Sequence, residues 1–133
     1  MAIELREITS DDYANLRELL ARMGWADRVR DEVRFQAMID GADRAVVAID
    51  RGVIVGFSRA LCDGVSNGYI SMVAVAPERR QQGIGRLLVE QLMSGDPDER
   101  ITWVLRAGRN STGFWERLGF SKSAIAMERV RKQ

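Results

Sequence analysis

The sequence predicts a mixed α/β fold, α+β-like, in which a mostly antiparallel, twisted central sheet with one parallel strand pair is flanked by about four helices. Two observations lead to this prediction. The apolar runs 45–49 and 53–61 are separated by Asp50-Arg51-Gly52, a turn sequence typical of a β-hairpin. Further on, an apolar strand, a glycine-rich loop, an amphipathic helix and a second strand follow in direct succession. Strands joined through a helix in this way lie parallel in one sheet.

The N-terminal segment predicts a short strand followed by a helix. Ile3 and Leu5 alternate with charged residues, as on a strand with one buried face. Apolar residues then recur at helical spacing from Tyr13 to Met23. Residues 9–12 offer helix N-caps, and Gly24 is suited to end this helix.

A second helix is expected from about Val29 to Ile39, with Val33 and Met38 on its apolar face and Gly41 at its end. The opposite face of this helix is strongly charged. The segment 62–68, which follows the hairpin, is rich in Gly, Asp, Ser and Asn and predicts a loop.

The second half of the chain predicts three strands and two helices. The strands cover Tyr69–Ala76, Ile101–Leu105 and Ala124–Val130, of which the last would close the sheet. The helices run from about Gly83 to Met93 and from about Ser111 to Leu118.

Length and composition predict one globular domain, residues 1–133. Apolar residues make up 46% and charged residues 29%, and the formal net charge of +1 gives no support to binding of nucleic acid or a membrane surface. We see no charged leader and no long apolar run, so neither a secretion signal nor a membrane span is expected. A single cysteine, Cys62, excludes an internal disulfide and indicates a cytoplasmic protein. The oligomeric state stays open, a homodimer included.

Histidine is absent from the sequence. Its absence excludes imidazole acid–base chemistry, Ser-His-Asp and Cys-His arrangements and most zinc sites, and we expect no metal. Cys62 has no imidazole to activate it, so its expected role is that of a small buried hydrophobe.

The stretch from Val73 to Arg86 carries the strongest functional signal. It runs Val-Ala-Val-Ala-Pro-Glu-Arg-Arg-Gln-Gln-Gly-Ile-Gly-Arg and leads directly into an amphipathic helix. A helix start has unpaired backbone N–H groups and the positive end of the helix dipole, and glycines there let a phosphate approach closely. Arg80 and Arg86 can add charge-assisted contacts. The stretch therefore predicts a pyrophosphate site.

Two common phosphate loops do not fit this stretch. A Walker-type loop needs Lys-Ser or Lys-Thr after its last glycine, and a dinucleotide fingerprint needs a third glycine where Leu88 stands. The pattern Arg80-Gln-Gln-Gly83-Ile-Gly85 after Val-x-Val-x-Pro instead resembles the acyl-CoA-binding signature of the GNAT superfamily of N-acetyltransferases. The resemblance covers most of the chain, up to Phe120. It implies a GNAT-type fold with acetyl-CoA as cosubstrate.

The resemblance also implies which residues contact the cosubstrate. Backbone N–H groups near Val73 to Val75 are suited to polarise the thioester carbonyl, because this strand must diverge from its neighbour to admit the pantetheine arm. A second motif, from Asn110 to Phe120, fits the family pattern loosely, and Asn110 either caps a helix or bonds the cosubstrate. The implied contacts are Val73, Ala74, Val75, Arg80, Gln81, Gln82, Gly83, Ile84, Gly85, Arg86, Asn110 and Trp115.

Trp115 departs from the family pattern, which usually has a tyrosine there that acts as general acid on the departing thiolate. An indole N–H donates a hydrogen bond but does not transfer a proton at neutral pH. Trp115 is therefore expected to wall the acyl pocket, while Phe114 and Phe120 are expected to pack in the core.

The base that family members often carry just before Val-x-Val is also missing. Tyr69 and Ser71 are the candidates here, since two-residue alternation places them on the face of Val73 and Val75. Either can hold a water that relays the proton to a more distant acid, such as Asp63 or Glu32. The identity of the catalytic acid and base stays unknown.

These features favour an acetyl-CoA-dependent N-acetyltransferase that moves acetyl directly to a primary amine, on a small molecule or on a peptide or protein. Direct transfer needs no activated nucleophile, and the sequence shows none. Two alternatives stay open: an acyl-CoA-binding sensor or interaction module of the same fold, and a nucleotide-binding protein whose loop imitates the motif. One wall of the acceptor site is expected from charged residues around the second helix: Arg28, Arg30, Asp31, Glu32 and Arg34.

Overall fold

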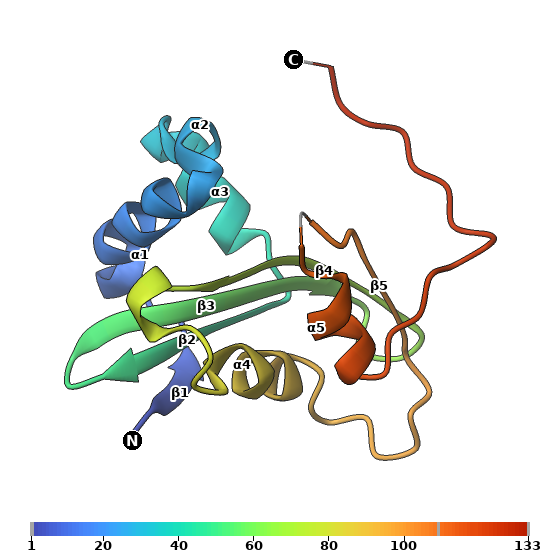
Figure 1. The fold of residues 1–133 in the computed structure, drawn as a ribbon. Coiled ribbons are helices and arrows are strands. Elements are labelled where there is room, and N and C mark those ends of the chain that lie inside the picture. The colour runs from blue at the N-terminus through green and yellow to red at the C-terminus, as the bar shows by residue number, and fades with distance from the viewer. Residues whose placement is uncertain (1, 109, 133) are drawn as a thin grey trace.

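The computed structural model describes residues 2–108 and 110–132, and it forms a five-stranded sheet with helices on both faces (Figure 1). Neighbouring strands run antiparallel except for the last pair, which is parallel. The predicted fold class is therefore confirmed. In spatial order the strands are β1 (Glu4–Glu7), β2 (Arg44–Asp50), β3 (Val53–Cys62), β4 (Asn67–Val75) and β5 (Thr102–Leu105).

The helices divide between the two faces of the sheet (Figure 1). The N-terminal group covers one face and consists of α1 (Tyr13–Leu20), α2 (Ala26–Val29) and α3 (Glu32–Asp40). The other face is covered by α4 (Ile84–Leu92), which joins β4 to β5, and by α5 (Thr112–Arg117). None of the helices in the described ranges has the length and apolar character that a membrane span requires.

The β2–β3 hairpin forms where the sequence predicts it. Arg51 and Gly52 both have positive φ, 53° and 79°, which is the conformation of a two-residue type I′ turn. This turn matches the right-handed twist of the strands, and glycine at its second position adopts the left-handed conformation without strain.

Each face of the sheet has its own hydrophobic core. Leu16, Leu20 and Phe35 from the N-terminal helices pack on Phe57 of β3, while Leu88 of α4 belongs to a second cluster on the opposite face. Both clusters are assembled from helical and strand residues that lie far apart in the sequence.

The sequence predicted Val33 on the apolar face of the second helix, and this prediction is wrong. The structure breaks the predicted segment into α2 and α3, and α3 buries Phe35 and Ile39, which are four residues apart on one side. Val33 lies on the other side of α3 and is 78% exposed.

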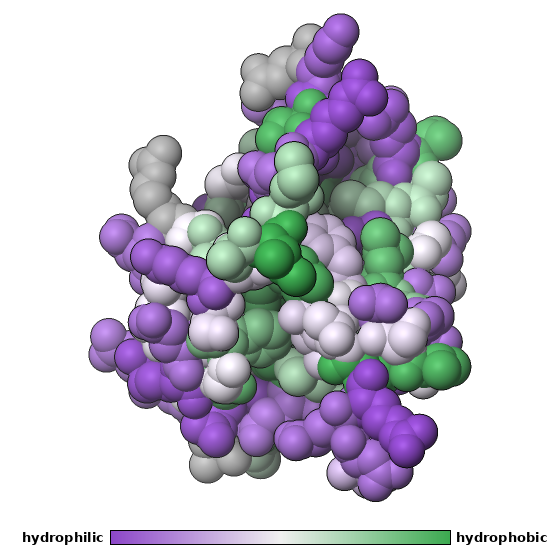
Figure 2. All heavy atoms as spheres, turned by 90° about the vertical axis from the view of Figure 1, so that its right-hand side faces the viewer, coloured by the Kyte–Doolittle hydropathy of each residue, from purple (hydrophilic) through white to green (hydrophobic). Residues whose placement is uncertain are grey.

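The predicted final strand Ala124–Val130 is wrong. Residues 120–132 have no regular secondary structure and lead away from the sheet (Figure 1). Met127 in this segment is 97% exposed. On this side of the molecule, atoms of hydrophobic residues, drawn in green, interrupt a mostly hydrophilic surface (Figure 2). A strand needs a hydrogen-bonded neighbour, and within the described ranges this segment pairs with none.

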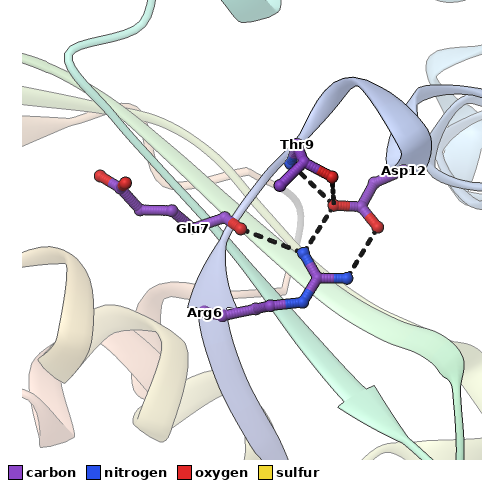
Figure 3. A network of polar contacts seen from close by, with 4 residues as sticks. All are labelled: Arg6, Glu7, Thr9 and Asp12. Atoms are coloured by element: carbon purple, nitrogen blue, oxygen red, sulfur yellow. Dashed lines mark hydrogen bonds and ion pairs between the residues drawn. The ribbon is translucent and has the colours of Figure 1, made fainter.

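A partly buried ion pair joins β1 to the start of α1 (Figure 3). Nη1 and Nη2 of Arg6 donate to the two carboxylate oxygens of Asp12 at 2.7 and 2.9 Å, and the backbone N–H of Thr9 donates to the same carboxylate at 2.8 Å. The Arg6 guanidinium holds the pKa of Asp12 below its ordinary value.

Candidate functional site

A cleft opens where β4 and β5 separate. Their parallel pairing ends at Ile70 and Leu105, but β4 continues to Val75 with β3 as its partner on one side. The cleft has a volume of about 1030 Å³ and is lined by the exposed part of β4, the start of α4, the start of α5 and the α1–α2 connection. This is the divergence of strands that the family resemblance implies.

The start of α4 has the geometry of an anion site. Gly83 is its N-cap residue, and no side chain caps the helix. The first bond of the helix is donated by Leu87 to the Gly83 carbonyl at 3.1 Å. The N–H groups of Ile84, Gly85 and Arg86 precede that bond and have no acceptor within the helix. They lie at the positive end of the helix dipole and beside the cleft.

The two glycines of the motif do different things. Gly83 has φ 82°, a left-handed conformation that favours glycine, and a Cβ there would meet nothing within 4 Å. At Gly85 a Cβ would lie 3.1 Å from the Phe114 ring. Gly83 thus leaves open space at the helix start, while Gly85 allows α5 to pack closely against α4.

Most of the residues that the sequence predicted for the cosubstrate line this one cleft. Ala74 and Gln82 do not line the cleft, and the Ala74 side chain is buried in the core between the sheet and the N-terminal helices. Ala74 is therefore restricted to backbone contacts. The predicted residues that line the cleft are Val73, Val75, Arg80, Gln81, Gly83, Ile84, Gly85, Arg86, Asn110 and Trp115.

Asn110 lines the cleft but does not occupy the N-cap of α5. Ser111 is the N-cap residue, and Asn110 precedes it with φ 59°, a left-handed conformation that asparagine tolerates. Of the two roles that the sequence left open for Asn110, the structure removes the N-cap.

Trp115 is largely a core residue. It is 8% exposed and packs edge-on against Phe114 and Phe120, with ring centroids 5.0 and 5.3 Å apart. A small part of it still lines the cleft. Phe120 packs in the core as predicted, whereas Phe114 both packs there and lines the cleft.

A β-bulge corrects the predicted position of Tyr69. Arg59 pairs with Met72 but Ala60 pairs with Ile70, so Ser71 is an extra residue of β4. Residues directly opposite in a ladder share a face. Beyond the bulge the alternation is therefore inverted, and Tyr69 lies on the α1–α3 face rather than on the face of Val73 and Val75.

The acids considered for a proton relay do not line the cleft. Asp63 accepts hydrogen bonds from three backbone N–H groups and the Ser66 hydroxyl within its own loop, which hold its pKa well below the ordinary value. Glu32 lies on a separate hollow and pairs with Arg17 at 3.9 Å. No Asp or Glu is among the described residues that line the cleft.

Of the five charged residues expected to form the acceptor wall, only Arg28 lines the cleft. Asp31 instead caps α3 by accepting from the backbone N–H of Arg34 at 3.1 Å. Sequence reasoning missed Arg59, which is 9% exposed and donates from Nη1 to the Ser71 hydroxyl at 2.7 Å. An arginine within the otherwise apolar run 53–61 is the signal that could have found it.

The fold and the cleft between β4 and β5 are those of GNAT-type acetyltransferases, and solved structures of such proteins superpose on this chain. A protein of the GNAT family from Xanthomonas campestris pv. campestris has the same fold, with a TM-score of 0.81 at 23% identity over 98% of this chain and 94% of that one. The structure of AAC(6')-Iy in complex with the bisubstrate analog CoA-S-monomethyl-acetylneamine also superposes, with a TM-score of 0.76 at 18% identity over 99% and 100%.

The sequence itself matches the acetyltransferase (GNAT) domain over residues 41–122, and the chain belongs to this family. GNAT domains are acyltransferase domains. A curated relative, serotonin N-acetyltransferase 2, chloroplastic, from Oryza sativa subsp. japonica, is 30% identical over 127 residues. That match covers 92% of this chain and 62% of the relative, so the chain spans less than two thirds of the relative's length.

Proposed function

We propose that the protein is an acetyl-CoA-dependent N-acetyltransferase that acts as a single domain and transfers acetyl directly to a primary amine. The observation that carries this proposal is the uncapped start of α4 beside the gap between β4 and β5. The name of the curated relative includes serotonin, and that of the bisubstrate analog bound to AAC(6')-Iy includes acetylneamine, and both names support an amine acceptor.

The residues present fit acetyl-CoA. The N–H groups of Ile84, Gly85 and Arg86 would hold its pyrophosphate, with Arg80 as an additional cation from the same loop. When bound, acetyl-CoA supplies an acetyl group activated as a thioester.

The chain itself contributes orientation and hydrogen-bond donors. The β4 backbone between Ser71 and Val75 has no strand partner on the β5 side, so its N–H groups there are available to a carbonyl oxygen in the gap. Because the described part of the cleft holds no carboxylate, this chain positions the acceptor as its free amine, already deprotonated in water, rather than deprotonating it through a carboxylate base. The pH dependence of turnover should then follow the pKa of the acceptor amine.

Gly83→Asn tests the cosubstrate site. Asparagine tolerates the left-handed backbone, and its side chain would fill the open space at the start of α4. We expect acetyl-CoA binding, measured by titration calorimetry, to weaken at least tenfold. Gly95→Asn is the matched control, since Gly95 also has positive φ and open space but does not line the cleft. Equal affinity in the two variants would refute the proposed site.

A panel of amines, amino acids and peptides then tests turnover. Acetyl transfer to any of these acceptors supports the proposed acetyltransferase activity. Acetyl-CoA binding without transfer to any amine would favour the acyl-CoA sensor, and binding of ATP or NAD in place of acetyl-CoA would favour the nucleotide-binding protein.

A further inference from the structure

The cleft carries positive charge that its own lining does not balance. Six arginines and no acidic residue are among the described residues that line it. Three of these arginines have carboxylate partners outside the cleft: Arg79 with Asp50, Arg86 with Glu90 and Arg106 with Glu128. Arg28 takes part in none of the ion pairs found within residues 2–108 and 110–132.

Arg28 and the start of α4 lie on opposite faces of the sheet. Arg28 belongs to α2, which packs on the α1–α3 face, while α4 packs on the other face. The gap between β4 and β5 connects the two sides within one cleft. If the pyrophosphate lies at α4, the α1–α3 side is left for the acceptor.

The bulge at Ser71 brings two further polar groups to this side. Tyr69 lies on the α1–α3 face and lines the cleft, as does Ser71 itself. The Ser71 oxygen accepts from Nη1 of Arg59 at 2.7 Å, so its own proton is free to be donated into the cleft. A hydroxyl beside a guanidinium is a poor base, and Ser71 is therefore a donor here rather than a proton acceptor.

Arg59 is a buried cation without a carboxylate partner in the described part of the chain. Its Nε donates to the Met38 carbonyl at 3.2 Å, and both of its bonds thus go to neutral oxygens. Burial lowers the pKa of Arg59, and the charge of Arg28 lowers it further. Burial likewise lowers the pKa of Arg28, and the charges of Arg131 and Arg106 add to that effect. A bound anion would relieve this repulsion.

We propose that the α1–α3 side of the cleft is an anion subsite, and that the acceptor is an amine that also carries a carboxylate or a phosphate. The Arg28 guanidinium provides a planar fork of donors, and the hydroxyls of Ser71 and Tyr69 add two more. An acceptor held by its anionic group at this end can direct its amine toward the gap between β4 and β5. The amine part of this inference rests on the proposed acetyltransferase function.

Binding of matched acceptor pairs in the presence of CoA tests the subsite. The pairs are tyrosine against tyramine for a carboxylate, and O-phosphoethanolamine against ethanolamine for a phosphate. With wild-type protein we expect titration calorimetry to show at least tenfold tighter binding of the anionic member in one pair. The pair that shows the preference identifies the anion.

Arg28→Gln should abolish the preference, and Arg28→Lys should retain part of it. Arg30→Gln is the matched control, because Arg30 is two residues away, pairs with Asp27 and does not line the cleft. The subsite is refuted if wild type shows no preference in either pair, if the preference survives in Arg28→Gln, or if Arg28→Gln weakens CoA binding itself. An anion preference without any CoA binding would overturn the proposed function and leave the subsite standing.

Discussion

The close approach of α4 to the sheet depends on Gly56 of β3. A Cβ at this position would lie 2.8 Å from Cδ1 of Leu88, 3.2 Å from Cγ2 of Ile84 and 3.2 Å from the Ala74 carbonyl oxygen. All three neighbours are buried, so none can move into solvent. Alanine at this position therefore forces α4 away from β3.

The expected cost of Gly56→Ala is the difference between two effects. Overpacking a core typically costs about 1–3 kcal/mol. Replacing glycine by alanine reduces the entropy of the unfolded chain and returns about 0.4–1 kcal/mol. We therefore expect the free energy of unfolding, measured by urea denaturation, to fall by about 1–2 kcal/mol.

A double-mutant cycle identifies the cause of this loss. Leu88→Val removes the Cδ1 atom that the new Cβ would meet, so the two substitutions together should cost about 1 kcal/mol less than the sum of the single costs. Gly113→Ala is the control, because a Cβ there would meet only Nη1 of Arg117 at 3.4 Å, and we expect it to leave stability unchanged or raise it. Additive costs at Gly56 and Leu88 would refute the packing argument.

Two further predictions concern acid stability and the chemical step. Asp12 has a pKa below its ordinary value of 3.8, so the stability that its pairing with Arg6 contributes is present above that value and is lost as the pH falls through the lowered pKa. Asp12→Asn should lower the free energy of unfolding by about 1.5–3 kcal/mol at pH 7 and should make it depend less on pH in acid. Urea denaturation at pH 7 and pH 3 checks both effects. Trp115→Phe should lose about 1–3 kcal/mol of stability but keep most of its activity in single-turnover transfer at saturating acetyl-CoA. A hundredfold loss of rate there would show that the indole N–H acts in the chemistry.

The sequence by itself determined the elements whose signals are local. The hairpin at Arg51 and Gly52, the helix that begins after Gly83 and the parallel strands on either side of it are all where the sequence predicted them. Turn residues, caps and apolar spacing act within a few residues of the chain, and they are visible in the sequence without knowledge of what packs against them.

Only the tertiary structure decided the composition of the acceptor side of the cleft. One extra residue at Ser71 inverts the alternation of β4 and moves Tyr69 to the other face, beside the region of Arg28 and Arg59. A bulge is a property of the pairing between two strands, and a shift of one residue changes the face of every side chain beyond it. Two-residue alternation, applied to β4 alone, could not show it.

The C-terminal segment is a second case in which local sequence was not sufficient, because the strand predicted there does not form. Its short apolar run 124–127 resembles that of a strand, but a strand forms only where a neighbour provides the hydrogen bonds, and within the described ranges none does so. Val33 was misplaced because the packing of α3 turns Phe35 and Ile39 toward the sheet, which leaves Val33 on the other side of the same helix. Local pattern therefore specified which elements form, whereas register, helix breaks and strand pairing depend on contacts between distant parts of the chain.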